Sequence, residues 1–223
     1  MWRSKVFLYC LAVDLVFIGI YVALRLAEMA GIMQMHSMLN LESESSFPSF
    51  FLYFQWIAMS VLLYRTARRR GSVAAGALGL FATLLFLDDA AQLHEQLGEV
   101  LASSFRLAPV SGVPADGLGE LVVLAGLGVI CLACILVAWL RPEGVGRPAI
   151  ATFLALAIIL AVIGVGIDVL HEIAGDDLSW LYGTAEDGGE MILGTAMLAL
   201  AAWISRAPRG KSPAPLPISQ DNL

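Results

Sequence analysis

Two seven-residue stretches place histidine and carboxylate side chains in the same order. They read LHEQLGE at 93–99 and LHEIAGD at 170–176, and an acid-glycine stretch follows each, ADGLGE and then AEDGGE. Imidazole and carboxylate groups are ligands of iron, manganese and zinc. The pattern therefore predicts a site for one or two of these divalent metal ions. The candidate ligands are His94, Glu95, Glu120, His171, Glu172 and Glu190, with Asp88 and Asp168 beside them.

Two imidazoles and four glutamates are also the ligand inventory of a dinuclear carboxylate site in a four-helix bundle. In this respect the predicted site resembles that of the ferritin-like di-iron and di-manganese proteins. The spacing differs, because those proteins use Glu-x-x-His, whereas here His and Glu are adjacent. Asp168-x-x-His171 has the required spacing, but Ala91 stands at the corresponding position of the first stretch.

The neighbouring acids share helix faces with these residues. Asp88 precedes Glu95 by seven positions and Asp168 precedes Glu172 by four, so each pair lines one face of a helix. Ionisable groups just below a membrane interface are costly when they face lipid, so they should face the protein interior. A network of shared protons and a set of solvated interfacial acids are the alternatives to a metal.

The elements that carry these residues are long apolar segments. The chain has 223 residues, of which 59% are hydrophobic and 14% charged, and its mean hydropathy is +0.80. These values predict an all-α integral membrane protein with six transmembrane helices, each of about 20 apolar residues. The predicted spans are Val6–Leu26, Ser49–Leu63, Val73–Leu93, Leu121–Leu140, Ala149–Val169 and Met191–Ser205.

Basic residues predict the orientation, because Lys and Arg are retained in cytoplasmic loops. Of 13 Lys and Arg residues, only Arg25 and Arg106 fall on one side of these spans. Both termini are therefore expected in the cytoplasm and the protein in the cell (inner) membrane. All acids except Asp14, Glu143 and Asp221 fall on the outer side, which favours uptake of protons or cations there. An acid of the first outer loop such as Glu44 is expected to be exposed.

The repeated stretches also predict an internal duplication. The third and fourth spans (73–141) and the fifth and sixth (149–206) each place LHE, a loop, an acid-glycine stretch and a helix in the same order. Two such hairpins would form a quasi-twofold four-helix bundle. One transmembrane domain is thus expected over 1–206, followed by a disordered cytoplasmic tail at 207–223.

This topology also predicts where the ligands lie along their helices. The third and fifth spans run outward, so both His-Glu pairs should lie at helix carboxyl ends, where an acid opposes the helix dipole. Glu120, Asp187 and Glu190 should lie at helix amino ends, where acids are ordinary caps.

Three further features are interpreted structurally. Met29, Met33, Met35, His36 and Met38 could bind copper, but methionines on a short interfacial helix are the preferred interpretation. Cys131 and Cys134 have redox spacing, yet they lie in an apolar span and are interpreted as buried small hydrophobes. Asp14 is predicted either to relay protons or to make a polar contact within the membrane.

These observations leave three classes of function open. The first is a metal-dependent enzyme of the outer leaflet, an oxidoreductase or a hydrolase, that acts on a membrane lipid or another amphiphile. The second is a transporter or sensor for divalent cations or protons, and the third is a membrane subunit that docks a partner. Nothing in the sequence is typical of nucleic-acid binding or determines an oligomeric state.

Overall fold

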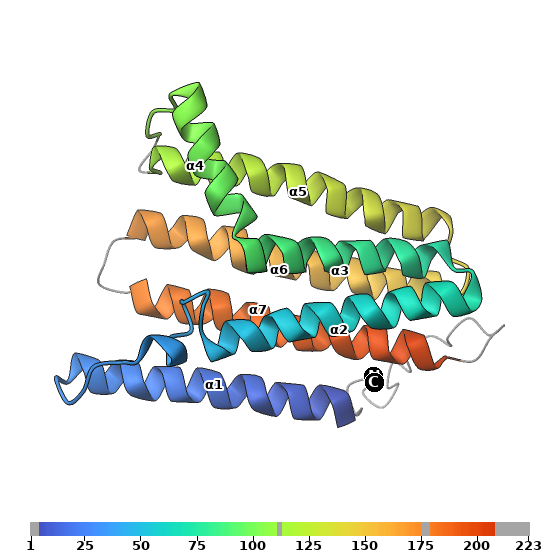
Figure 1. The fold of residues 1–223 in the computed structure, drawn as a ribbon, viewed down its shortest axis with the longest axis horizontal. Helices are drawn as coiled ribbons and strands as arrows, with labels where there is room; N and C mark the ends of the chain where they lie inside the picture. Colours follow the sequence, from blue (N-terminus) through green and yellow to red (C-terminus); the bar gives the residue numbers. More distant parts are fainter. Residues whose placement is uncertain (1–4, 111–112, 175–178, 208–223) are drawn as a thin grey trace, which may run out of the picture.

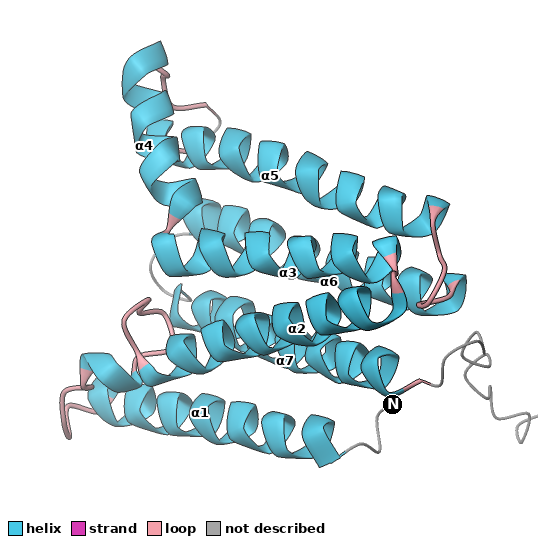
Figure 2. Ribbon diagram, turned by 45° about the vertical axis from the view of Figure 1, so that its right-hand side comes forward, coloured by secondary structure: helices cyan, strands magenta, loops and turns pink. Residues whose placement is uncertain are grey.

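The computed structural model describes residues 5–110, 113–174 and 179–207, except for the side chains of residues 168–174 and 179. This part of the chain forms seven α-helices and one short 3-10 helix, with no β-sheet (Figures 1 and 2). In chain order they are α1 (Lys5–Met29), η1 (Ser37–Leu39), α2 (Phe47–Arg70), α3 (Val73–Ala91), α4 (Leu93–Phe105), α5 (Ala115–Leu140), α6 (Arg147–Ala174) and α7 (Ser179–Arg206).

Six of these helices are long and apolar enough to cross a membrane, namely α1, α2, α3, α5, α6 and α7. The predicted all-helical chain with six apolar segments is thus confirmed. Five of these helices extend beyond the predicted spans, most of all α2 and α7, whereas α3 does not. The apolar runs mark only the middle of each helix, and the polar turns at its ends were interpreted as loops.

The long helices run roughly side by side, with α1 and α5 at opposite edges (Figures 1 and 2). Helix α7 is central, because α1, α2 and α6 all pack against it, and its residues from Met191 to Ile204 are mostly buried. Helix α2 also packs against α3, which packs against α5. Large buried side chains such as Trp56, Phe153 and Met197 fill the core between these helices.

This arrangement does not support the predicted quasi-twofold bundle. Helix α2 contacts both α3 and α7, so it belongs to the same bundle as the last four long helices. The two stretches that suggested the repeat also differ in structure. LHEQLGE forms the start of the separate helix α4, whereas residues 170–174 continue the long helix α6.

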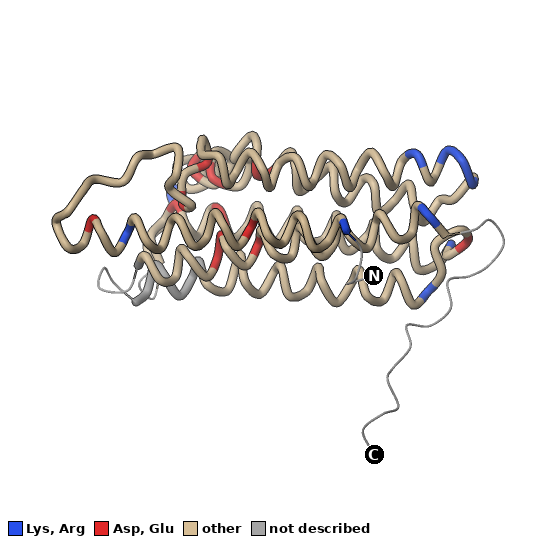
Figure 3. The backbone as a smooth tube through the Cα atoms, turned by 90° about the horizontal axis from the view of Figure 1, so that it is seen from below, with Lys and Arg blue, Asp and Glu red and all other residues tan. Residues whose placement is uncertain are grey.

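Polar contacts tie the chain together at the end of the bundle that carries the short connections. The Arg70 guanidinium donates hydrogen bonds to the carbonyl oxygens of Gly144, Ser205 and Ala207 at 2.7, 3.1 and 2.6 Å. Figure 3 shows most Lys and Arg of the described residues at this end, while the Asp and Glu residues lie mainly toward the other. The predicted separation of charge along the bundle is therefore present in the fold.

The third apolar helix ends two residues before its predicted end. Gln92 has φ 48° and ψ 46°, a left-handed conformation that separates α3 from α4. The Asp88 carboxylate stabilises this break by accepting a hydrogen bond at 3.1 Å from the backbone N–H of His94, in the first turn of α4. The prediction that His94 and Glu95 lie at a helix carboxyl end is therefore wrong, since both lie at the amino end of α4.

Candidate functional site

A cavity of about 610 Å³ lies between α2, α3, α5, α6 and α7. One set of lining residues is apolar, with Phe81, Leu127, Ile135 and Leu160 among them, and the other set is strongly acidic. The acidic set contains nine carboxyl groups and one imidazole, but no Lys or Arg among the described residues. Its members are Glu42, Glu44, Asp88, Asp89, Glu95, Glu120, Glu186, Asp187, Glu190 and His94.

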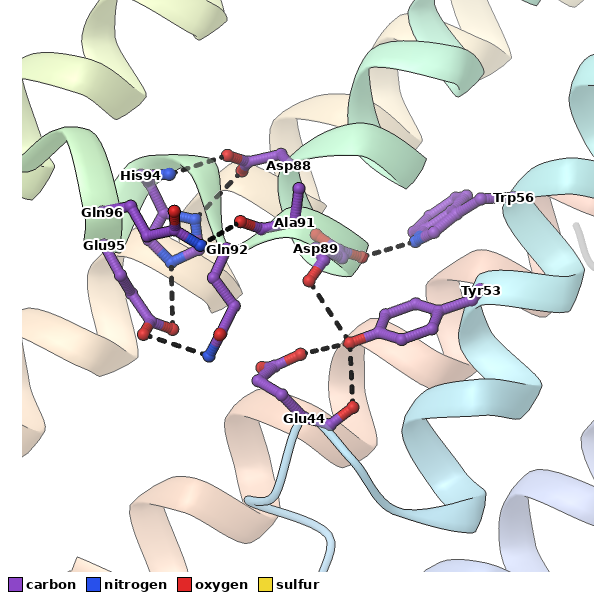
Figure 4. A network of polar contacts seen from close by, with 10 residues as sticks. All are labelled: Glu44, Tyr53, Trp56, Asp88, Asp89, Ala91, Gln92, His94, Glu95 and Gln96. Atoms are coloured by element: carbon purple, nitrogen blue, oxygen red, sulfur yellow. Dashed lines mark hydrogen bonds and ion pairs between the residues drawn. The ribbon is translucent and has the colours of Figure 1, made fainter.

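His94 is the basic group of this lining. Its Nδ1 lies 3.2 Å from Asp88 Oδ2, and its Nε2 lies 4.0 Å from Glu95 Oε1 (Figure 4). Burial alone would lower the pKa of His94, but its interaction with Asp88 and the nearby charges of Glu95 and Asp89 outweigh this and raise the pKa to about 9. The imidazole is thus held as a cation by the acids around it. A metal ion would have to displace this proton.

A second group of contacts links the first loop, α2 and α3. The Trp56 indole donates a hydrogen bond at 2.7 Å to Asp89 Oδ2, and the Tyr53 hydroxyl lies 3.2 Å from the Asp89 carbonyl oxygen (Figure 4). The same hydroxyl donates to the Glu44 carboxylate. Burial raises the pKa of Glu44, and the hydrogen bond from Tyr53 opposes this effect. Glu44 therefore lines the cavity, and its predicted place on the exposed surface is wrong.

Five of the eight predicted ligands, from four different helices, line this one cavity. They are Asp88 on α3, His94 and Glu95 on α4, Glu120 on α5 and Glu190 on α7. The other three, Asp168, His171 and Glu172, belong to α6, and their side chains lie outside the described residues.

The three acids that were interpreted as caps lie inside helices, and Glu120 is the sixth residue of α5. Helix α7 begins at Ser179, so Asp187 and Glu190 are two and three turns into it, and the cap interpretation is wrong for both. Glu190 approaches α6 closely, because its Oε1 would lie 2.5 Å from a Cβ at Gly164. Glycine at this position leaves the room that the carboxylate occupies.

A metal site is not assembled within the described residues. They contain no group of three or more His, Cys, Asp or Glu side chains arranged to hold a metal ion. The Asp88–His94 pair is a carboxylate–imidazole contact, but two groups do not complete a coordination shell. The predicted iron, manganese or zinc site stays a prediction, in which Asp168, His171 and Glu172 would have to take part.

Several lining residues are not among the predicted ligands. Glu42 and Glu44 precede α2, and Glu186 lies in the AEDGGE stretch, which precedes the predicted sixth span but belongs to α7. The adjacent Asp88 and Asp89, which end an apolar run, are a signal that could have indicated a second buried acid. Tyr53 gave no such signal, since an aromatic residue in an apolar helix is ordinary.

The other singled-out residues lie outside the acidic part of the cavity. Asp14 is fully buried and accepts hydrogen bonds from Gln55 Nε2 at 3.0 Å and from the Thr195 hydroxyl at 2.7 Å. These contacts join α1 to α2 and α7, which confirms the predicted polar contact. Cys131 and Cys134 are buried, as predicted, and both are free cysteines.

Comparison with known families identifies one match. A family model described as Domain of unknown function (DUF8692) matches residues 6–206. The chain therefore belongs to this family, and the match covers almost the whole helical part. Curated proteins and solved structures give no match to the chain.

Proposed function

We propose that this member of the DUF8692 family is a multi-pass membrane protein whose cavity binds an amphiphile with a positively charged head group. The observation that carries this proposal is the two-part lining of the cavity. Carboxylates gather in one part, and side chains such as Phe81, Leu127 and Ile135 form the other. A ligand with an apolar chain and a cationic head would satisfy both parts.

The charge of the lining favours a cation. Nine carboxyl groups and a single imidazole cannot all be ionised in a partly buried space without a counter-charge. The rings of Tyr53 and Trp56 also line the cavity, and aromatic faces attract organic ammonium groups. An amine or quaternary ammonium head group therefore suits the cavity better than a neutral or anionic one.

The cavity wall suggests that the ligand comes from the lipid phase. Leu132 on α5 and Ile158 on α6 line the cavity, yet their exposed fractions are 58% and 55%. Residues that are both lining and exposed mark a lateral opening, here between α5 and α6. In a bilayer this opening would face hydrocarbon chains, so the apolar chain of a lipid could enter there.

The distribution of charge supports an orientation in the membrane. The Arg-rich end, with the α2–α3 and α5–α6 connections, would be cytoplasmic by the positive-inside rule. Both termini would then be cytoplasmic in the cell (inner) membrane, and the acidic part of the cavity would lie in the outer half of the bilayer.

A metal-dependent enzyme is the second candidate, and the Asp88–His94 contact favours it. A carboxylate that orients an imidazole is a common arrangement around metal ions. Iron, manganese or zinc bound with the help of His171 and Glu172 could serve an oxidoreductase or a hydrolase acting on an amphiphile. Metal analysis of protein purified in mild detergent tests this candidate. We expect the purified protein to contain close to a stoichiometric amount of metal, and alanine substitution of His94 and His171 to remove it.

Ligand binding tests the first candidate. Protein in phosphatidylcholine nanodiscs is mixed with hexadecylamine, or with hexadecanol as an uncharged ligand of equal chain length, and thermal unfolding is followed. We expect hexadecylamine, but not hexadecanol, to raise Tm. This rise should be smaller in a Glu190→Gln variant. Glu143→Gln is the matched control, because Glu143 is exposed at the other end of the bundle. Equal effects of amine and alcohol, or an unchanged response of Glu190→Gln, would contradict the proposal.

A further inference from the structure

We infer that α4 lies in the outer surface of the membrane, with one edge of the helix in contact with zwitterionic lipid. Its 13 residues are too few to span a hydrocarbon core. The inference rests on the membrane insertion proposed above, but it does not depend on what the cavity binds.

The exposed side of α4 is divided into two edges. Leu97 and Phe105, with exposed fractions of 48% and 72%, lie on one side of the helix, and Val100, which is 57% exposed, lies between this side and the polar edge. Gln96, Glu99 and Ser103 lie along the other edge and are also exposed. Such a division places an amphipathic helix at a boundary between an apolar and an aqueous phase.

The packing of α4 prevents the apolar edge from turning inward. Gly98 and Ala102 are buried, and Gly98 meets Gly119 of α5 so closely that a Cβ at Gly119 would lie 2.1 Å from the Gly98 carbonyl oxygen. This backbone contact fixes the rotation of α4 about its own axis. Its apolar edge therefore needs a partner outside the chain.

The position of α4 indicates that this partner is lipid. Only Gln92 separates α4 from the end of α3, and α4 crosses α5 near its start (Figure 1). Exposed apolar residues continue along α5 itself, where Val122 and Val129 have exposed fractions of 60% and 69%. The apolar edge of α4 thus joins the belt of α5 that would face hydrocarbon chains.

The charge of α4 indicates which lipids it suits. The helix carries two glutamates and no Lys or Arg. Helices that bind anionic membranes through charge have basic polar faces. Because the exposed polar edge, formed by Gln96, Glu99 and Ser103, has no basic residue, it favours zwitterionic over anionic head groups.

Spin labelling tests the inference on the full chain in nanodiscs. Single cysteines replace Leu97, Val100, Gln96 or Ser103 in a background without Cys10, Cys131 and Cys134, and nitroxide accessibility to oxygen and to a water-soluble nickel chelate is measured. We expect the ratio of oxygen to nickel accessibility to be severalfold higher for Leu97→Cys than for Gln96→Cys and Ser103→Cys, with Val100→Cys between them. For Leu97→Cys, this ratio should also be higher in phosphatidylcholine than in phosphatidylglycerol nanodiscs.

A label at Val129 of α5 distinguishes this inference from membrane insertion as such. If Val129→Cys is lipid-exposed while Leu97→Cys and Val100→Cys are as accessible to nickel as Ser103→Cys, α4 lies in water and the inference is wrong. Labels on α4 that neither reagent reaches would show a protein partner, which also overturns it. Water exposure of Val129→Cys would refute membrane insertion itself.

Discussion

Gly119→Ala is expected to displace α4 from α5. A Cβ at Gly119 would lie 2.1 Å from the carbonyl oxygen and 2.7 Å from the carbonyl carbon of Gly98, whereas ordinary contact begins at 3.4 Å. Both of these atoms belong to the backbone, so no side chain can rotate away. The two helices would have to separate by roughly 1 Å or more, and their other contacts would loosen.

The cost should be concentrated in α4, because this helix packs mainly against α5 and only slightly against α3. Overpacking of this kind costs about 1–3 kcal/mol. If the loss falls on the local opening of α4, its backbone amides should exchange roughly 5- to 150-fold faster. Hydrogen–deuterium exchange of peptides from α4, measured by mass spectrometry in nanodiscs, gives this rate directly.

Gly126→Ala is the matched control for this substitution. Gly126 belongs to the same helix, and a Cβ at that position would meet no atom of another helix within 4 Å. Its α4 peptides should exchange at the wild-type rate. If Gly119→Ala also left the exchange of α4 at the wild-type rate, the close backbone contact between α4 and α5 would be refuted.

Three further substitutions test other parts of the structure. Thr195→Val removes the hydroxyl that donates to Asp14 and should lower the free energy of unfolding by about 1–3 kcal/mol. Thr152→Val, which loses a hydrogen bond within its own helix, should lower it less. Equal losses in chemical denaturation would contradict the role of the buried contact. The pKa of His94 is raised from 6.5 to about 9, so its charge stabilises the fold below pH 6.5 and this stabilisation is lost as pH rises through 9. The free energy of unfolding should therefore fall less across this range in His94→Gln than in wild type. Parallel curves of stability against pH would refute the raised pKa of His94. Leu132→Trp should narrow the lateral opening and slow association of hexadecylamine severalfold in stopped-flow mixing, and an unchanged rate would exclude this route.

The sequence predicts the number and type of the long helices but not where they end. Apolar runs identify the six helices, because burial in a membrane requires about 20 apolar residues per span. The break at Gln92 has no sequence signal, since neither Gly nor Pro lies between Leu85 and Leu93. It depends on a left-handed residue and on the Asp88 side chain, which only the fold brings into contact with the next helix.

The candidate site, like the helix ends, can be predicted from the sequence only in part, because some of its contacts depend on the fold. Asp88 and Glu190 stand beside apolar residues, so their burial in the bundle could be expected from cost alone. Glu44 could not be identified in this way, because its place in the cavity depends on how the first loop folds back over Tyr53. The AEDGGE stretch lies outside the predicted sixth span, because glycines and acids are typical of loops. In the structure it forms part of α7.

The two proposals together constrain how a ligand could reach the cavity. His94 and Glu95 line the cavity from the first turn of α4, and Leu97 and Val100 lie one and two turns farther along the same helix. If α4 lies at the level of the lipid head groups, with Leu97 and Val100 directed toward the hydrocarbon chains, the acidic part of the cavity lies at nearly the same depth. An amphiphile of the outer leaflet would then keep its head group at this level while its chain moved sideways between α5 and α6. Such a path never carries the charged head group through the hydrocarbon core, which is the costly step in most movements of lipids across membranes.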